Sequence, residues 1–322
     1  MRRWLGLMLV LLLFAGVATG CRTKPLEKEA PAKKVEIPSG ISQGKNKEPK
    51  LRVYLANEDS VVTMNMEEYI QGVVAAEMDP DWPLEALAAQ AIEARTFTLQ
   101  KIAEQGTLPG RDAHASTSIE EFQAYDASRI NDNVRKAVNN TRGLAAVYQG
   151  EYVRGWFHAY CGGITATPRA GLNYQGEEPP YFKPVENPCR EYVDKEIEFW
   201  SKTFTKSQIR GAVTSITKED PGDFSSIEIS EAESGRAVTF KVGQVSVPAA
   251  ELRLALGSTE MRSTLVDPPT VSGNEVKFVG RGYGHGVGLC QWGAKGWAEE
   301  GRSAEEIVKG FFPGVDIQKL WD

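Results

Sequence analysis

The hydrophobic pattern changes its period along the chain, and this change limits the folds that are open to it. Residues 66–77 and 83–103 repeat apolar side chains every three or four positions, which predicts two amphipathic helices. Residues 196–279 instead contain alternating runs, including 226–229 and 237–242, which predict strands. Because helices and most strands occupy separate stretches, the sequence predicts an α+β fold in which a helical segment packs with a mixed, β-rich region.

The balance of charges excludes one class of partner. The 322 residues include 37 lysines and arginines and 43 aspartates and glutamates, which gives a formal net charge of −6. A dedicated nucleic-acid-binding protein needs a basic face, so no nucleic acid is expected as a partner. The hydrophobic fraction of 41% is ordinary for a globular protein and argues against a chain that is disordered throughout.

The N-terminus has the order of features of an exported bacterial lipoprotein. Two arginines precede an apolar run at 4–17, and small residues then lead to Cys21. This run is short for a membrane-spanning helix but suits a secretory signal. We predict that residues 1–20 are a lipoprotein signal peptide and that Cys21 is lipidated, which anchors the protein to a membrane of the cell envelope. The alternatives are an ordinary signal peptide or an uncleaved anchor.

The stretch after Cys21 predicts a tether. Residues 22–50 hold eight basic and four acidic side chains, four prolines and almost no large apolar residues. Such a composition cannot bury a core, so we expect residues 21–50 to be a disordered, solvated linker. The folded part is then one elaborated domain over 51–322, with a β-rich insertion at about 196–279.

A carboxylate interrupts the apolar face of the first predicted helix. Met66, Ile70, Val73 and Glu77 fall within a narrow arc of the helical wheel, with Glu77 at the C-terminal end. Desolvation and the negative end of the helix dipole both disfavour the ionised carboxylate, so the pKa of Glu77 is expected to be raised. A carboxyl that carries a proton at neutral pH is suited to general acid catalysis. The alternative is that the last turn frays and leaves Glu77 in water.

The second predicted helix also has a charge on its apolar stripe. Leu84, Ala88, Ala91 and Arg95 share one arc, and a buried guanidinium persists only with a partner. In one interpretation Arg95 and Glu77 neutralise each other, which would lower the pKa of the glutamate. In the other, Arg95 holds the architecture or the substrate beside the acid.

A glycine-rich loop near the C-terminus provides a third candidate. Glycines alternate with other residues through 280–288, but Val287 occupies a position where the dinucleotide-binding pattern requires glycine. The loop precedes a helix predicted near Ala294, so its free amides could bind an oxyanion or sugar hydroxyls. The alternative is a tight connection between a strand and a helix, in which His285 is structural.

Several of these motifs occur together in a known family. The chain resembles the stage II sporulation protein D family, whose relatives include amidase-enhancer proteins, and the resemblance covers essentially all of residues 51–322. The motifs that carry it lie, in the same order, at residues 68–78, 82–96, 157–163, 234–236 and 282–294.

This resemblance implies an activity. A similar protein would be a peptidoglycan lytic transglycosylase that cleaves the β-1,4 bond between MurNAc and GlcNAc in glycan strands without stem peptides, and its catalytic glutamate matches Glu77. One carboxyl can protonate the glycosidic oxygen and then accept the proton of the C6 hydroxyl, which closes a 1,6-anhydro ring. The alternative is a non-catalytic peptidoglycan-binding protein that enhances a cell-wall amidase.

We predict a set of further site residues around Glu77. The residues predicted to bind the glycan are Arg95, Gln123, Tyr125, Tyr283, His285 and Gln291.

The cysteines of the folded part leave two interpretations. Exported thiols tend to pair, so we favour a disulfide between Cys161 and Cys189, with Cys290 free. Alternatively, His158, Cys161 and Cys189 bind zinc, as some relatives are thought to do near these positions. Ile164 stands where many relatives have histidine, which weakens the zinc interpretation, and the predicted catalysis requires no cofactor.

Overall fold

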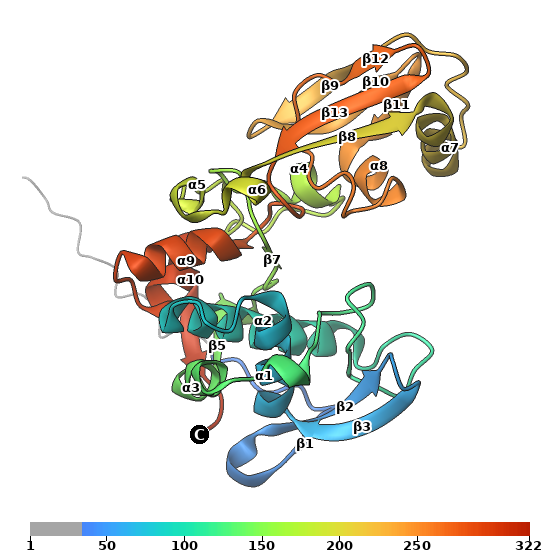
Figure 1. The fold of residues 1–322 in the computed structure, drawn as a ribbon. Coiled ribbons are helices and arrows are strands. Elements are labelled where there is room, and N and C mark those ends of the chain that lie inside the picture. Colours follow the sequence, from blue (N-terminus) through green and yellow to red (C-terminus); the bar gives the residue numbers. More distant parts are fainter. Residues whose placement is uncertain (1–33) are drawn as a thin grey trace, which may run out of the picture. The chain divides into compact units, whose positions relative to one another are not determined.

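The computed structural model describes residues 34–322, whose helices and strands are labelled in Figure 1. The predicted signal peptide and the lipidation site at Cys21 lie outside the described residues.

The first sheet joins the start of the described chain to the two predicted strands. Its antiparallel order is β1-β2-β3, and β4 pairs in parallel with β2. Ile41 is buried beside this sheet, so ordered structure begins before the predicted boundary at Leu51. The composition of residues 22–50 as a whole predicts a disordered tether, but it does not reveal the short pairing of β1 with β2 within that stretch. The strands are β1 (Ser42–Gln43), β2 (Pro49–Leu55), β3 (Ser60–Asn65) and β4 (Ala115–Ser116), and a short 3-10 helix spans Lys45–Lys47.

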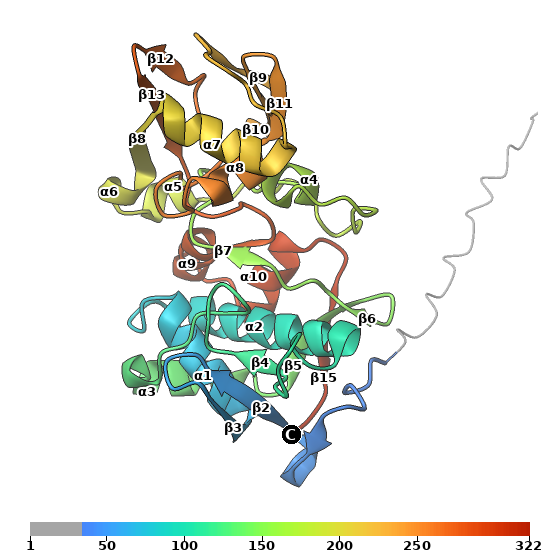
Figure 2. The same cartoon turned by 90° about the vertical axis from the view of Figure 1, so that its right-hand side faces the viewer.

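Two helices follow, where the periodicity predicts them. Helix α1 (Met66–Glu77) begins after Asn65, which occupies the N-cap position although its side chain makes no capping hydrogen bond. Helix α2 (Leu84–Gln105) begins after Pro83. The elements that it contacts are α1, α3 (Asp132–Asn140), β5 (Leu144–Tyr148), α9 (Gln291–Glu299) and α10 (Ala304–Phe311). Figure 2 shows α2 as the long helix around which these elements gather. A 3-10 helix at Ala127–Arg129 lies against α1.

The C-terminal end of the chain completes a sheet of the helical part. Its last strand, β15, pairs antiparallel with β5, which pairs in turn with β6. Helix α10 begins with a capping box formed by Ser303 and Glu306 and packs against α2. These elements are β5 (Leu144–Tyr148), β6 (Glu151–Tyr152), α10 (Ala304–Phe311) and β15 (Asp316–Lys319).

The stretch predicted as a β-rich insertion has a hydrophobic core of its own. That core packs two three-stranded antiparallel sheets, β11-β10-β9 and β12-β13-β8, with two helices that the strand pattern did not predict. The elements are β8 (Phe199–Thr205), α7 (Lys206–Thr217), β9 (Ile227–Glu233), β10 (Arg236–Val242), β11 (Val245–Pro248), α8 (Ala249–Ala255), β12 (Thr270–Ser272) and β13 (Glu275–Arg281).

A short parallel pair brings the middle of the chain to the glycine-rich loop. In β7 and β14, Phe157 aligns with Leu289 and His158 with Cys290. Helix α9 follows β14 directly and packs against α5. The remaining elements are β7 (Phe157–His158), α4 (Pro168–Leu172), α5 (Cys189–Tyr192), α6 (Lys195–Glu198), β14 (Leu289–Cys290) and α9 (Gln291–Glu299).

The predicted fold class is confirmed, because helices and several small sheets form a mixed α+β architecture. Within residues 34–322, no helix combines the length and the apolar character needed to cross a bilayer.

Candidate functional site

Glu77 is the last residue of α1, and the structure holds its carboxylate at both oxygens. The amide N–H of Ala124 donates to Oε1 at 3.1 Å, and the side-chain amide of Gln291 donates to Oε2 at 3.3 Å. The side chain of Glu77 is partly exposed, so it is neither fully buried nor fully solvated. Burial raises the pKa of Glu77, and the two donated hydrogen bonds oppose part of that rise.

Gln291 joins the glycine-rich loop to the first helix. It is the first residue of α9, and its side chain is buried. Gln291 directly follows β14, and its hydrogen bond places it beside Glu77 although the two residues are 214 positions apart. Gln291, predicted as a site residue, is therefore brought to the candidate acid.

The loop after β4 covers the other side of Glu77. The ring of Tyr125 stacks on that of Tyr69 at 5.8 Å and lies against Gly72, where a Cβ atom would be 2.1 Å from Tyr125. Tyr125 is partly exposed, whereas Gln123 is buried and donates to Thr98 Oγ1 at 3.0 Å. Tyr125 therefore lines the surroundings of Glu77, while Gln123 belongs to the packing beneath them.

Arg95 does not pair with Glu77. Its guanidinium is 0% exposed and donates to both carboxylate oxygens of Glu67, with Nη2–Oε2 at 2.6 Å and Nε–Oε1 at 3.2 Å. Glu67 also accepts from the N–H of Gly143 at 2.9 Å and from the indole of Trp321 at 3.0 Å. The interpretation in which Arg95 neutralises Glu77 is wrong, and so is the prediction that Arg95 binds substrate, because the core encloses its charge completely.

An aromatic pair that the sequence analysis missed lies next to Gln291. The rings of Trp82 and Trp292 are 4.6 Å apart, and Lys295 Nζ lies 4.6 Å from the centre of the Trp292 ring and 5.2 Å from that of Trp82. Trp82 and Lys295 are partly exposed. The available signal was that Trp82 opens the motif at 82–96 and that Trp292 directly follows Gln291 in the motif at 282–294.

Tyr283 and His285 are placed with the cysteines. The backbone of Tyr283 pairs with that of Tyr160 through hydrogen bonds of 2.7 and 2.9 Å. The ring of His285 lies 5.5 Å from that of His158, and its Nδ1 accepts from the N–H of Val287 at 3.1 Å. Burial keeps the pKa of His285 well below its ordinary value. Both residues therefore shape the glycine-rich loop, and their role in glycan binding stays a prediction.

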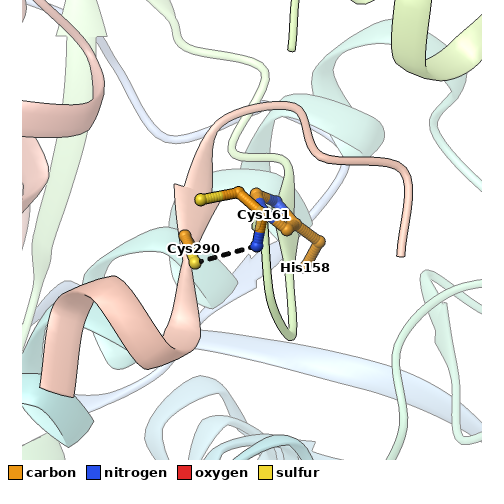
Figure 3. Close-up of side chains that lie close together, drawn as sticks. All are labelled: His158, Cys161 and Cys290. Carbon is orange, nitrogen blue, oxygen red and sulfur yellow. Dashed lines mark hydrogen bonds between the residues drawn. The ribbon is translucent and has the colours of Figure 1, made fainter. Parts of the chain in front are cut away.

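Three cysteines and one histidine converge in the interior. The Sγ atoms of Cys161 and Cys189 are 3.3 Å apart, longer than a disulfide bond of about 2.05 Å, and all three thiols are free. The favoured Cys161–Cys189 disulfide is therefore not formed. The N–H of Cys161 donates to Sγ of Cys290 at 3.3 Å, so Cys290 belongs to the same cluster (Figure 3). Its inclusion follows from the parallel pairing of β7 with β14, which no local pattern predicts.

The chemistry of this cluster suits a metal ion. The ligand atoms of His158, Cys161 and Cys290 lie within 4.8 Å of one another, and all three residues are buried. Nδ1 of His158 lies 3.1 Å from the carbonyl of Val287, while Nε2 is buried without a hydrogen-bond partner in the described chain. A carbonyl on one ring nitrogen and a free lone pair on the other is the usual arrangement of a metal-binding histidine. The group could therefore hold a metal ion such as zinc.

A second glutamate is buried in α2 and has no predicted role. Glu93 is 0% exposed, and within residues 34–322 neither of its carboxylate oxygens has a hydrogen-bond partner. Burial alone raises the pKa of Glu93 to about 8. At neutral pH the folded protein therefore keeps Glu93 protonated.

We expect Glu93→Gln to change how stability depends on pH. Between about pH 4.5 and 8 the unfolded chain loses the Glu93 proton while the folded protein retains it. The free energy of unfolding of the parent therefore falls with rising pH in this window, and the variant should gain stability relative to the parent. Urea denaturation at pH 5 and pH 8 measures this, with the surface variant Glu104→Gln as control. An identical pH dependence in parent and Glu93→Gln would contradict the protonated state.

Comparisons with known proteins agree with the arrangement of these motifs. Residues 54–148 match the family described as SpoIID, stage II sporulation protein. The chain is 33% identical to an uncharacterized protein of Brachyspira hyodysenteriae over 79% of this chain and 67% of that protein. It is 27% identical to the stage II sporulation protein D of Bacillus subtilis, over 94% of this chain and 85% of the relative. It is also 29% identical to the amidase enhancer of Bacillus subtilis, of which it spans 40%. The chain therefore belongs to the stage II sporulation protein D family.

Proposed function

We propose that this protein is a peptidoglycan lytic transglycosylase that cleaves the β-1,4 bond between MurNAc and GlcNAc in denuded glycan strands. The observation that carries this proposal is the state of Glu77. Its carboxyl is partly exposed, its pKa is raised by burial, and two separate segments of the chain hold it in place. A raised pKa favours the protonated form of the carboxyl, which is the form that a general acid needs.

One carboxyl is sufficient for the proposed reaction. Glu77 donates its proton to the glycosidic oxygen as the bond to the anomeric carbon breaks, and the C6 hydroxyl of the same MurNAc attacks that carbon. The Glu77 carboxylate accepts the hydroxyl proton, which leaves a 1,6-anhydro-MurNAc end and restores the acid. The hydrogen bonds from Ala124 and Gln291 stabilise the transient anion, because both donors are amide N–H groups. A hydrolytic glycosidase would instead need a second carboxyl to activate water or form a glycosyl intermediate.

The partly exposed aromatic rings around the acid support a glycan as substrate. Tyr125 directly follows Ala124, whose N–H donates to Glu77. Trp82 packs against Trp292, which directly follows Gln291. Flat apolar rings with a polar edge suit sugar rings, which have an apolar face and a rim of hydroxyl groups. We assign glycan contacts to Tyr125 and Gln291, and leave Arg95 and Gln123 to the core.

Product analysis tests the activity. Purified protein is incubated with denuded glycan strands, and the products are separated and weighed by mass spectrometry. The expected fragments end in 1,6-anhydro-MurNAc, which weighs one water less than a hydrolysed end. Fragments with reducing ends would instead indicate a hydrolase and would overturn the mechanism above.

A second function is favoured by the name of one relative. The chain is similar to an amidase enhancer. The alternative proposal is that this protein binds peptidoglycan without cutting it and enhances a cell-wall amidase. Intact strands that co-sediment with the protein, together with a faster amidase in its presence, would support this alternative over catalysis.

We propose that the protein is exported and anchored as a lipoprotein, which would hold the domain next to peptidoglycan. The expected evidence is that Cys21→Ala abolishes both lipid labelling and membrane retention, because only the cysteine thiol accepts the lipid. Cell fractionation measures retention, with Ser39→Ala as a control substitution outside the cysteine cluster. Unchanged retention of the Cys21→Ala chain would favour an uncleaved anchor.

We also propose that a structural zinc ion is held by His158, Cys161, Cys189 and Cys290. Cys189 joins the other three ligands because its Sγ lies 3.3 Å from that of Cys161. Asn187 donates to Sγ of Cys161 at 3.2 Å. Burial raises the pKa of Cys161, but hydrogen bonds with Cys189, Cys290 and His158 outweigh this effect and hold the pKa well below its ordinary value. When bound, zinc would link these distant segments and stabilise the fold.

The zinc proposal predicts a stoichiometry. Purified protein should contain about one zinc per chain, because structural zinc sites bind tightly at neutral pH. Cys290→Ser should lose most of this zinc, whereas Cys21→Ser should keep it. In the Cys21→Ser chain, three thiols should react after denaturation in chelator without reductant. A single reactive thiol and no zinc would restore the disulfide interpretation.

A further inference from the structure

Arg236 is a buried cation whose counter-charge is not a carboxylate. It is the first residue of β10 and is 0% exposed. Nη2 donates to the backbone carbonyl of Cys161 at 2.6 Å, while Nε and Nη1 have no hydrogen-bond partner within residues 34–322. No ion pair of the described chain includes Arg236, although burying a guanidinium without a counter-charge is strongly unfavourable. Something in its surroundings must therefore be negative.

The surroundings of this guanidinium are the two segments that carry the cysteines. The carbonyl that it contacts belongs to Cys161, and its other side lies against Gly286 of the glycine-rich loop. A Cβ atom at Gly286 would come within 2.6 Å of the guanidinium, and the φ of +85° there also favours glycine. The absence of a side chain at Gly286 therefore leaves the space that the Arg236 guanidinium occupies.

Neighbouring polar groups also lack a negative partner. The hydroxyl of Tyr160 is buried without a hydrogen-bond partner in the described chain. Arg253 of α8, which is also buried, donates to the carbonyls of Arg262 and Ser258. The surroundings of the cluster therefore contain more donors and positive charges than the neutral thiols can satisfy.

We propose that Arg236 is the buried counter-cation of a metal–thiolate centre formed by His158, Cys161, Cys189 and Cys290. This inference rests on the zinc proposal above. Three thiolates, one neutral imidazole and a divalent zinc ion carry a net charge of about −1, which one guanidinium neutralises. The charge of Arg236 therefore stabilises the centre when the metal is bound and destabilises the fold when the centre is empty.

The arrangement gives the β-rich insertion a connection to the candidate active site. Arg236 starts a central strand of the insertion, and its partner Cys161 lies three residues after His158. Cys290 immediately precedes Gln291, which holds Glu77. Arg236 therefore acts as a positioning residue, since it ties the insertion to the centre from which α9 begins.

The test measures zinc affinity in the full chain, and activity is not its readout. Competition with a chromophoric chelator gives the affinity, and the thiolate charge-transfer band of the cobalt-substituted protein reports the ligand set. Arg236→Met removes the charge and keeps most of the volume, and Arg236→Lys keeps the charge. Arg210→Met, in an exposed ion pair of the same insertion, is the matched control. Circular dichroism shows that each variant is folded.

We expect Arg236→Met to weaken zinc binding by about 10- to 100-fold, as removal of a second-layer partner of a metal site typically does, and to leave the cobalt band in place. Arg236→Lys and Arg210→Met should bind within a few-fold of the parent. A folded Arg236→Met chain with parental affinity overturns the role of Arg236 and leaves the zinc proposal intact. If Arg236→Met does not fold, the zinc affinity of a folded Arg236→Lys chain is the deciding measurement. Parental affinity would support a role for the positive charge, and a large loss of affinity would overturn it. A parent chain that binds no zinc overturns the zinc proposal itself.

Discussion

Glu77→Gln is expected to abolish glycan cleavage and to leave the fold intact. Glutamine keeps the volume of the side chain and accepts the hydrogen bond from Ala124, but it cannot deliver or accept a proton. General acid–base assistance is worth about 10²- to 10⁴-fold, so the rate of anhydro-MurNAc formation should fall at least that far. Mass spectrometry of the products measures the rate, and co-sedimentation should show that strand binding persists.

The same helix provides the control for this variant. Glu68 is exposed in the first turn of α1, so Glu68→Gln makes the same chemical change away from the candidate site and should cleave at the parental rate. Because burial raises the pKa of Glu77, the parental rate should decline with rising pH at a higher pH than it would for a carboxyl of ordinary pKa. If Glu77→Gln forms anhydro ends at the parental rate, the chemistry lies elsewhere, and His285 becomes the next residue to test.

Arg95→Ala is expected to be the most destabilising single change among these predictions. It leaves the Glu67 carboxylate, whose side chain is 4% exposed, without the cation that balances it. Breaking a buried ion pair in this way costs about 3–5 kcal/mol, a large part of the 5–15 kcal/mol that stabilises an ordinary domain. The midpoint of urea denaturation should fall accordingly, and activity should fall with it because α1 begins at this pair.

A surface ion pair gives the comparison. Arg135 and Asp132 are 3.1 Å apart on α3, but their side chains are 52% and 103% exposed. Such a pair contributes at most about 1 kcal/mol, so Arg135→Ala should unfold close to the parental midpoint. Equal midpoints for Arg95→Ala and Arg135→Ala would mean that the Glu67–Arg95 pair is not a structural centre of this fold.

The helices around the candidate acid could be predicted because their signals are local. The apolar stripe of Met66, Ile70 and Val73 predicts α1 from its first to its last residue and places Glu77 at its end. Pro83 marks the start of α2 in the same way. Such patterns depend on neighbours within one or two turns, which the sequence contains in full. The β-rich stretch was identified by its alternation, but its two helices were missed.

The partners of the charged and sulfur-bearing side chains were decided only by the tertiary structure. Arg95 could have paired with any of the three glutamates of α1, and the packing of α2 on α1 selects Glu67, 28 positions away. The parallel pairing of β7 with β14 brings Cys290 to Cys161 across 129 positions, and α9 brings Gln291 to Glu77 across 214. The sequence by itself determined which residue types carry the chemistry and on which local element each one lies. Which of them meet depends on the path of the whole chain, because contacts at such separations follow from how the elements pack and leave no periodic trace in the sequence.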